Sequence, residues 1–385
     1  FEFSTVGGWV ATRSAGMQSD AFGKIEDMVV CLTMVTPSGT IETRPVPACS
    51  SGPDLNRMMA GSEGVLGIIT ECTMRVHKAP ASKDHRGFLF KDFASGVEAM
   101  HDCLEEGIRP NIIRLQDPFE TQLAFHMKTP KTGLVGFIQK QMKKVLKARG
   151  YGEPVIMIMG VEGEPKDVAA RGKAVRKILK KRGGFDLGKS VGATWYKDKY
   201  NLPYLRDWVM DRACMVDVAE TSTLWSNVLN LHEKVTAAMN AKFKADGTPG
   251  FVGCHLSHTY RPGACMYFTY ACKQIPGREL EQYYSYKKLI TQTFLDNGAT
   301  LTHHHAVGTE HRPWMEQELS PTGVKALRAL KAGLDPAGLC NPGKLIPDLQ
   351  PFLGWAQSTK AGDDSGQHRN GSAGDAARHE DKKLV

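Results

Sequence analysis

The sequence predicts an α+β protein in which a glycine-rich, strand-forming segment precedes a larger domain of alternating strands and helices. Three observations support this prediction. The first 80 residues carry two glycine-rich loops beside strand-like runs. After residue 83, short apolar runs alternate with amphipathic helical patterns, which favours a mixed or antiparallel sheet over a doubly wound dinucleotide-binding domain. The length of 385 residues exceeds what one hydrophobic core usually serves, so we expect two domains.

The overall composition narrows the class of protein and of partner. An apolar share of 41% and a charged share of 23% are those of an ordinary globular protein. The formal charge of +8 favours anionic partners, either phosphate esters or a lipid surface, whereas the chain carries no signature of a nucleic-acid-binding module. Nine scattered cysteines without a Cys-x-x-Cys pair argue against a disulfide framework and for a reducing compartment. No apolar run reaches the roughly 18 residues of a membrane span, so we expect neither a membrane span nor a signal peptide within this sequence.

The glycine-rich loops are the first candidate binding elements. The segments Ser4–Gly8 and Thr12–Gly16 each run from hydroxyl or basic residues into glycine, and Gly61–Gly67 repeats this character. Glycine lets the main chain approach a phosphate or a flat ring, and consecutive amides form anion-binding nests. The alternative is that each loop only joins strands. Because a second loop resembles the first, we expect both to face one ligand from two sides.

The elements of the first 80 residues follow from pattern and turn chemistry. Met28–Val35 reads as an apolar strand, Thr36–Gly39 as a turn and Thr40–Arg44 as the partner strand. Asp54 is expected to cap a short helix that ends near Met59. Gly67–Val76 is expected to form the third strand.

The later elements alternate in type. Strands are expected at Gly87–Phe90, Asn111–Leu115, Pro154–Gly160 and within Gly250–Cys272, and helices at Ala94–Glu106, Pro165–Lys181, Leu224–Phe243 and Leu280–Leu295. We therefore expect a first domain over residues 1–80, a cap and substrate domain over 84–300 and a returning segment over 301–350. Residues 352–385 are rich in glycine, serine, alanine and mixed charge and are expected to be disordered.

A histidine triplet, His303, His304 and His305, is the clearest candidate for chemistry. On a strand, His303 and His305 would share one face, so the triplet could act as acid or base, bind a metal, or form an exposed histidine run. We expect no metal, because no carboxylate or cysteine lies at ligand spacing nearby in the sequence.

Three further side chains are candidates for proton transfer or anion binding. Tyr267 lies in an apolar strand, where it is either a core tyrosine or a proton shuttle whose pKa a neighbouring cation lowers. Arg114 and Arg206 are bordered by apolar residues and suit a phosphate or carboxylate, unless they pair with Asp117 and Asp207 respectively.

A basic amphipathic helix is expected over Leu134–Arg149. Its apolar face carries Leu134, Ile138, Met142 and Val145, and lysines surround that face. This pattern is typical of a helix that lies on an anionic membrane and equally of a packed cap helix with a solvated basic face.

An ordered series of motifs resembles a known family. The series is Ser4–Met17, Gly23–Val30, Gly61–Thr70, Ile113–Leu115, Glu220–Ser222 with Trp225, Gly263–Phe268 and His303–His305. It resembles the alkylglycerone-phosphate synthases, also called alkyl-dihydroxyacetonephosphate synthases, of the vanillyl-alcohol-oxidase-type FAD family. The resemblance covers about residues 1–347 and is far more specific than any single motif.

The resemblance implies a fold and a cofactor. Residues 1–80 would be the second half of a VAO/PCMH-type FAD-binding domain whose upstream half precedes Phe1, followed by the α+β cap. Val65 stands where the family pattern leads us to expect a hydroxyl residue, which removes one side-chain bond to FAD. The residues implied to hold FAD noncovalently are Phe1, Glu2, Phe3, Ser4, Thr5, Thr12, Arg13, Ser14, Ala15, Glu63, Gly64, Val65, Leu66, Gly67, Ile68 and Ile69.

The resemblance also implies an activity. The family exchanges the acyl group of acyl-dihydroxyacetone phosphate for a long-chain fatty alcohol in ether lipid biosynthesis, without net redox change. Tyr267 would be the general acid/base and Arg206 the ligand of the substrate phosphate, while Arg114 and the histidine triplet would be needed for activity. A homodimer, a peroxisomal location and contact with a membrane surface are further implications.

An alternative activity comes from the segment Asp335–Leu345. It looks more like the ending of FAD-linked D-2-hydroxyacid dehydrogenases of the D-lactate or glycolate type. In such an enzyme the same fold would oxidise a small hydroxyacid, and the histidine triplet would supply a base or metal ligands.

Overall fold

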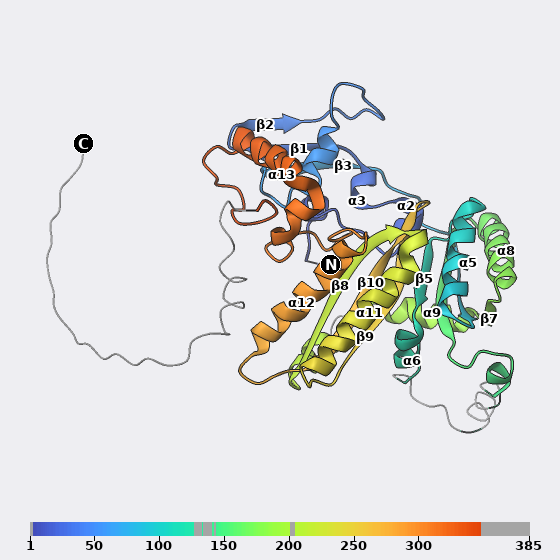
Figure 1. Cartoon of the computed structure of the whole chain (residues 1–385). Helices are drawn as coiled ribbons and strands as arrows, with labels where there is room; N and C mark the ends of the chain where they lie inside the picture. Colours follow the sequence, from blue (N-terminus) through green and yellow to red (C-terminus); the bar gives the residue numbers. More distant parts are fainter. Residues whose placement is uncertain (1–2, 127–132, 134–140, 142–143, 201–204, 348–385) are drawn as a thin grey trace, which may run out of the picture. The chain divides into compact units, whose positions relative to one another are not determined.

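The computed structural model describes residues 3–126, 133, 141, 144–200 and 205–347, and every structural statement below concerns these residues. They form an α+β fold with two sheets (Figure 1). The smaller sheet has the strand order β2-β1-β3 and the larger one the order β7-β4-β6-β5-β9-β10-β8. All pairings between described strands are antiparallel. The predicted fold class is confirmed, and of the two expected sheet types the antiparallel one is present.

The described elements, in chain order, have the following bounds. The strands are β1 (Val29–Thr36), β2 (Gly39–Glu42), β3 (Ile68–Met74), β4 (Ser82–Phe90), β5 (Ile112–Gln116), β6 (Val155–Gly163), β7 (Phe185–Gly188), β8 (Cys214–Leu224), β9 (Gly250–Thr259) and β10 (Gly263–Lys273). The helices are α1 (Val6–Ala11), α2 (Ser19–Phe22), α3 (Ile25–Met28), α4 (Leu55–Met59), α5 (Phe93–Glu105), α6 (Pro118–His126), α8 (Pro165–Lys181), α9 (Lys189–Asp198), α10 (Leu205–Met210), α11 (Val228–Ala245), α12 (Glu279–Asp296) and α13 (Met315–Leu334), with short 3-10 turns η2 (Trp225–Asn227) and η3 (Arg312–Trp314).

The small sheet forms as the sequence predicts, whereas the first glycine-rich segment does not remain a loop. Asp54 caps α4, since its side chain accepts a hydrogen bond from the Arg57 amide at 3.2 Å. Likewise, the Thr5 hydroxyl accepts the Gly8 amide at 3.1 Å and begins α1. The amides expected to form an anion nest at Ser4–Gly8 are therefore partly used by a helix.

Gly67, at the start of β3, is held against β1. A Cβ atom there would lie 2.4 Å from the backbone oxygen of Val35. We expect Gly67→Ala to lower the free energy of unfolding by about 2–4 kcal/mol, because the two paired strands would have to separate. Denaturant unfolding measures this. Gly39→Ala is the matched control, since Gly39 also has a positive φ but open space around it, and it should cost only about 1 kcal/mol. Equal losses for the two variants would contradict the contact argument.

The two faces of the large sheet are covered differently. Helices α5, α8, α11 and α12 pack on one face, where side chains such as Leu115 and Phe268 form the main core. On the other face, α9 covers β4 and β6, and α6 packs on β6, through a second cluster around Leu89 and Ile158. Helix α6 also packs on β5 and β9 of this face, and the rest of the face over β9, β10 and β8 meets the N-terminal segment and the segment after α12.

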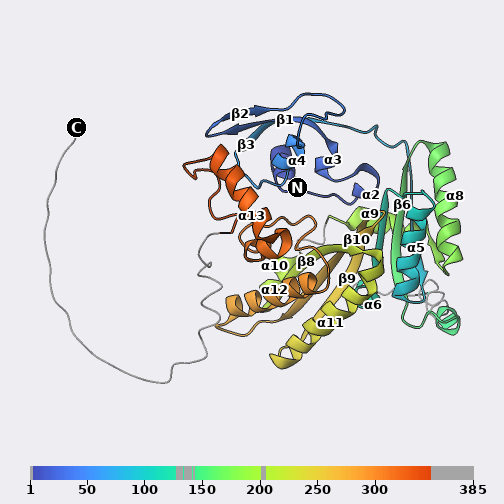
Figure 2. The ribbon, with the colours of Figure 1, turned by 45° about the horizontal axis from the view of Figure 1, so that its top comes forward.

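The small sheet lies beyond one end of the large sheet, with α13 beside it (Figures 1 and 2). The Ser38 hydroxyl and amide donate to the backbone oxygens of Gly333 and Leu334, and Lys331 Nζ donates to the backbone oxygen of Val65 at 2.7 Å. The end of α13 thus contacts the segment that carries the small sheet.

A buried carboxylate joins α2 to the end of β9. One oxygen of Asp20 accepts both the amide and the hydroxyl of Thr259, at 2.5 and 2.6 Å. Burial raises the pKa of Asp20 from 3.8 to about 6, although the Thr259 bonds oppose this shift. Because the folded pKa lies above the unfolded one, the stability cost is full above pH 6 and disappears as the pH falls through the window from about 6 to 4.

We therefore expect Asp20→Asn to stabilise the protein by about 1–3 kcal/mol at pH 8, with the gain fading toward pH 4. An asparagine oxygen can still accept both Thr259 bonds, but the amide has no charge to desolvate. Denaturant unfolding at several pH values tests this. Asp207→Asn, at an exposed carboxylate, is the control and should change the stability by less than about 0.5 kcal/mol. A loss of stability at pH 8 for Asp20→Asn would contradict the prediction.

Two expectations concern residues that the structure does not describe. Most of the basic helix expected over Leu134–Arg149, and the whole tail over 352–385, lie outside the described residues. None of the helices in the described part of the chain combines the length and apolar character that a membrane crossing requires.

Candidate functional site

Strand pairing gathers the candidate residues on one face of the large sheet. Tyr267 on β10 lies directly opposite His255 on β9 and Glu220 on β8. His255 in turn pairs with Gln116 on β5, and Arg114 stands two residues before Gln116. Directly paired residues and residues two apart share a face of a sheet. Four strands thus present these side chains to the face that the core helices leave uncovered.

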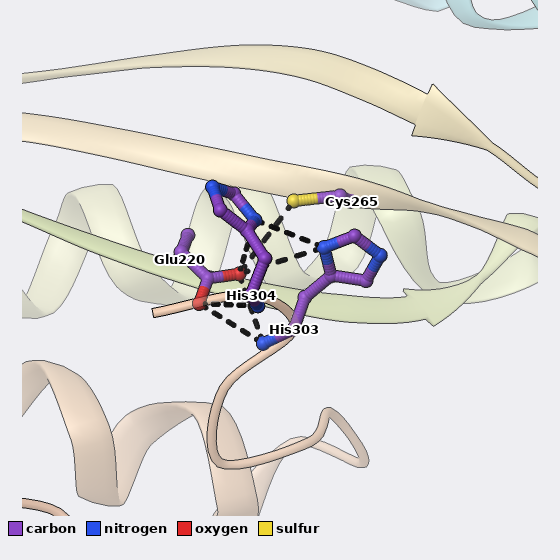
Figure 3. A group of neighbouring side chains, drawn as sticks. All are labelled: Glu220, Cys265, His303 and His304. Atoms are coloured by element: carbon purple, nitrogen blue, oxygen red, sulfur yellow. Dashed lines mark hydrogen bonds and ion pairs between the residues drawn. The ribbon is translucent and has the colours of Figure 1, made fainter. Parts of the chain in front are cut away.

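Glu220 organises the histidine triplet. The backbone amides of His303 and His304 donate to its carboxylate at 2.9–3.0 Å (Figure 3). The His305 amide, at 2.9 Å, and the Thr302 hydroxyl donate to the same group. The carboxylate is 2% exposed. Burial raises its pKa, but the side-chain hydrogen bonds from His304 and Thr302 outweigh this and hold the pKa well below the ordinary value. Glu220 is therefore a buried anion that fixes a loop.

The histidine triplet does not lie on a strand. Residues 303–305 form bends. Successive amides of a strand point in opposite directions, so three of them reach one carboxylate only if the chain curves around it. The following Ala306 has a φ of 65°, in the left-handed region. His303 and His305 consequently do not share a strand face.

The imidazoles of His303 and His305 are neutral at physiological pH. Burial lowers the pKa of His303 to about 3 and that of His305 to about 4, against the opposing influence of Glu220. The Tyr260 hydroxyl lies 2.5 Å from Nε2 of His303, and Lys24 Nζ donates to the His303 backbone oxygen at 2.8 Å. Both rings are therefore deprotonated at neutral pH and can accept a hydrogen bond or a proton, although the lowered pKa values make them weak bases.

Tyr267 is surrounded by rings. Its ring stacks on His255 with a centroid distance of 4.8 Å, and His305 meets it edge-on at 5.3 Å. Burial raises the pKa of the phenol, although Arg114 acts in the opposite direction. The expectation of a lowered pKa is therefore wrong for this structure: the phenol is neutral and can donate a proton or a hydrogen bond.

The two candidate arginines have different surroundings. Arg114 Nη2 lies 3.4 Å from a Glu120 oxygen and 3.1 Å from Nδ1 of His255, so its carboxylate partner is not Asp117. Arg206 lies on α10, which packs against β8, and forms an ion pair with Asp207 at 3.5 Å in which both side chains are largely exposed. The structure thus places Arg114 beside His255, the residue that stacks on Tyr267. It pairs Arg206 with Asp207, the alternative considered from the sequence.

A thiol and a carboxylate do lie beside the triplet, contrary to the argument from sequence spacing. Glu220, Cys265, His303 and His304 offer ligand atoms within 4.8 Å of one another (Figure 3). They escape notice in the sequence because β8 and β10 supply two of them. Glu220 already accepts the amides of the triplet, so a cation there would have to replace these bonds.

A cavity of about 760 Å³ lies where the glycine-rich segments Thr12–Gly16 and Gly61–Gly67 meet the segment that carries the histidine triplet. The Gly61 and Glu63 amides donate to the backbone oxygens of Val10 and Ala11 at 3.0 and 2.8 Å. The Glu63 carboxylate accepts the amides of Val307 and Gly308, both at 2.7 Å. The loops therefore face one space from two sides, as expected.

The lining of this cavity fits a flat ring attached to an anionic group. Val65 and Leu66 supply buried apolar walls, while Arg13 and Lys24 supply positive charge. The Ser62 hydroxyl is buried, and no described residue forms a hydrogen bond with it. A buried hydroxyl of this kind calls for a polar partner. The residues present thus fit a flavin nucleotide, and Val65 occupies an apolar wall position.

The residues expected to hold FAD divide into several groups. Thr12, Arg13, Glu63, Val65 and Leu66 line the cavity. Phe3 and Ile68 point largely to solvent, and Thr5 caps α1. Ser4, Ser14, Ala15, Gly64, Gly67 and Ile69 are not among the lining residues, and Phe1 and Glu2 lie outside the described part of the chain.

Backbone strain concentrates at this site. Within the described residues, eight non-glycine residues have a positive φ, and Arg13, Glu63, His258 and Ala306 are four of them. Such conformations persist where the surrounding structure fixes them, and they cluster at functional sites. Sequence reasoning also left Glu220, Glu120, His255, Lys24 and Ser62 without roles. Only strand alternation, which places His255 on one side of its strand, could have pointed to any of them.

Comparisons with known proteins agree on one family. A family model described as FAD linked oxidases, C-terminal domain, matches residues 79–345, and a model described as FAD binding domain matches residues 1–44. The alkyldihydroxyacetonephosphate synthase of Dictyostelium discoideum is 41% identical over 92% of this chain, and that of Trypanosoma brucei brucei is 35% identical over 90%. The chain covers 59% and 57% of the length of these two relatives.

A solved structure supports the same grouping. A structure of an alkyldihydroxyacetonephosphate synthase is 37% identical to this chain and superposes with a TM-score of 0.72. The match covers 90% of this chain and 59% of the solved one.

Proposed function

Because the chain belongs to the family of FAD-linked oxidases, we propose that the protein is an alkyldihydroxyacetonephosphate synthase. Its cofactor is FAD. The proposed reaction exchanges the acyl group of acyl-dihydroxyacetone phosphate for a long-chain fatty alcohol and releases a fatty acid. The observation that carries the proposal is the meeting of Tyr267 and the histidine triplet on one sheet face, beside the cavity that the glycine-rich segments line.

Arg13, Lys24 and Ser62 would hold the flavin nucleotide in this cavity. Bound there, FAD supplies an electron-rich ring that allows a carboxylate to leave an otherwise unreactive carbon, with no net oxidation.

The protein's own residues then have to place the substrate and move protons. An imidazole of the triplet would take the proton from the substrate carbon that bears the ester. His303 and His305 are deprotonated at neutral pH, as this role requires, but their lowered pKa values make them weak bases. The neutral phenol of Tyr267 can donate a proton to a developing anion, and Arg114 stabilises negative charge beside it. The fatty alcohol supplies the oxygen of the new ether bond, and the ester oxygen leaves with the fatty acid.

The test is a product assay on the purified full-length protein. Incubation with acyl-dihydroxyacetone phosphate and a long-chain alcohol should give one fatty acid for each ether product, and the protein should show flavin absorbance. An assay with D-lactate and a dye acceptor tests the alternative activity, that of a D-2-hydroxyacid dehydrogenase. Bleaching of the dye without ether formation would identify a dehydrogenase instead.

We retain Arg206 as the ligand of the substrate phosphate. Its ion pair with Asp207 joins two exposed side chains, and such pairs contribute little, so a phosphate can compete for the guanidinium. Arg206→Ala should raise KM for the phosphate substrate about tenfold and change kcat less than threefold. Arg212→Ala, whose guanidinium packs 3.7 Å above the Trp208 ring, is the control and should leave KM within twofold. An unchanged KM in Arg206→Ala would remove this role.

The proposal includes a peroxisomal location, a homodimer and contact with a membrane surface. Its support is the resemblance to synthases together with the net charge of +8, which favours an anionic surface. Fluorescence microscopy of the tagged protein, gel filtration and co-sedimentation with anionic vesicles test the three parts separately.

A further inference from the structure

A second buried carboxylate, that of Glu120, lies next to Arg114 and His255. Glu120, at the start of α6, faces the same side of the sheet as Arg114 and His255. One of its oxygens lies 3.1 Å from Nδ1 of His255, and the other lies 3.4 Å from Nη2 of Arg114. The Thr269 hydroxyl and the Gln116 amide donate to the two oxygens at 3.4 and 3.3 Å. Both carboxylate oxygens are thus fully engaged.

Glu120, His255 and Arg114 determine each other's charge states. Burial raises the pKa of Glu120, but His255 and Arg114 lower it to about 2, so the carboxylate is ionised. Burial and the neighbouring Arg114 lower the pKa of His255, so its ring is neutral and can donate Nδ1–H to Glu120. A buried anion next to a single cation holds that cation firmly, since either alone would be costly to bury.

The group also supports the phenol. The His255 ring stacks on Tyr267 with an angle of 27° between the planes, and the two residues are direct partners across β9 and β10. Thr269, two residues after Tyr267 on the same face, is tied to Glu120. Movement of Glu120 would therefore disturb both the guanidinium of Arg114 and the ring of Tyr267.

We propose that Glu120 and His255 are positioning residues, which fix the Arg114 guanidinium and the Tyr267 ring relative to each other for the transfer reaction. This inference rests on the proposed function for its assay, but the geometry is independent of the substrate. Neither residue has to touch the substrate. Their role is to hold the Arg114 guanidinium and the Tyr267 phenol, which do contact the substrate, in one arrangement.

The test compares two buried glutamate–histidine pairs in the full-length enzyme. Glu120→Gln keeps the size of the side chain and removes its charge, so kcat should fall about 10- to 100-fold while KM changes less than threefold. The control is Glu162→Gln on β6. Glu162 is equally buried and lies 2.8 Å from Nε2 of the buried His85, but it contacts neither Arg114 nor Tyr267 among its described partners. The kcat of Glu162→Gln should stay within threefold of the wild-type value, while its melting temperature should fall about as much as that of Glu120→Gln.

A double-mutant cycle shows whether Glu120 acts through Arg114. In an Arg114→Lys background, Glu120→Gln should reduce kcat by less than threefold, because the group that Glu120 holds is already altered. Flavin absorbance and the melting temperature confirm that each variant is loaded and folded.

The outcomes are distinguishable. Equal kcat for Glu120→Gln and Glu162→Gln, or an undiminished effect of Glu120→Gln in the Arg114→Lys background, would overturn the positioning role. A wild-type enzyme that forms no ether would instead overturn the proposed function. If Glu120→Gln does not fold, Glu120→Asp, which keeps the charge at a shorter reach, replaces it and should show a kcat loss of about three- to tenfold that Glu162→Asp does not share.

Discussion

Replacing Tyr267 with phenylalanine is expected to reduce the release of fatty acid from acyl-dihydroxyacetone phosphate by about 10³-fold or more. The substitution removes only the hydroxyl group, and a positioned proton donor of this kind contributes about 10²–10⁴-fold to a rate. The ring stack on His255 should remain, so folding and flavin absorbance should be close to those of the wild type. A coupled assay of fatty-acid release, with the flavin content measured in parallel, gives the result.

Tyr270→Phe is the matched control for this experiment. Tyr270 lies on the same strand but faces the core, where its hydroxyl donates to Asp217 at 2.8 Å. Its loss should cost about 1 kcal/mol of stability and less than threefold in activity. Full activity of Tyr267→Phe, or equal losses for the two variants, would count against the role of Tyr267.

Replacing Glu220 with glutamine is expected to cost about 3–5 kcal/mol of stability and at least about 100-fold in activity. The amides of His303, His304 and His305 converge on one oxygen of this carboxylate. A glutamine would keep at most that oxygen as an acceptor, would place its NH₂ group where the second oxygen meets the His303 amide at 2.9 Å, and would remove the negative charge. The histidine loop should then open. Thermal unfolding and limited proteolysis between residues 301 and 308 measure the structural effect.

Glu318→Gln provides the comparison for Glu220. Glu318 accepts the Leu301 amide at 2.9 Å and the Thr300 hydroxyl at 2.5 Å, just before the triplet. Because it holds one amide and not three, its substitution should cost about 1–2 kcal/mol. Proteolysis of the loop at the wild-type rate in Glu220→Gln would show that other contacts fix the triplet.

Much of the fold follows from local pattern. Asp54 and the turn at Thr36–Gly39 produce the elements that their chemistry predicts. On β10, alternation places Tyr267 opposite in direction to Met266 and Phe268, which are core residues. These features depend on residues within a few positions of each other, so a sequence can reveal them.

The candidate site depends on pairings that no local pattern contains. The triplet reads as a strand because histidines among threonine and valine give no turn signal, while the group that bends it, Glu220, lies 83 residues earlier. Likewise, Arg114 has an acidic residue at Asp117 nearby in sequence, but strand geometry and α6 bring Glu120 and His255 to it instead. The sequence does not reveal the helix α1 at Val6–Ala11, because its two glycines lower helix propensity and the Thr5 cap compensates locally.

The bond from the Asn341 amide group to the backbone oxygen of Glu63 spans 278 positions of the chain. Lys331, which bonds to Val65, closes a loop of similar size. During synthesis, therefore, the second glycine-rich loop emerges long before the residues that brace it, and closures of this length are slow to form. Capture of the nucleotide is consequently an event of the finished polypeptide, and a ribosome stalled before residue 331 would carry a nascent chain with an incomplete cofactor cradle.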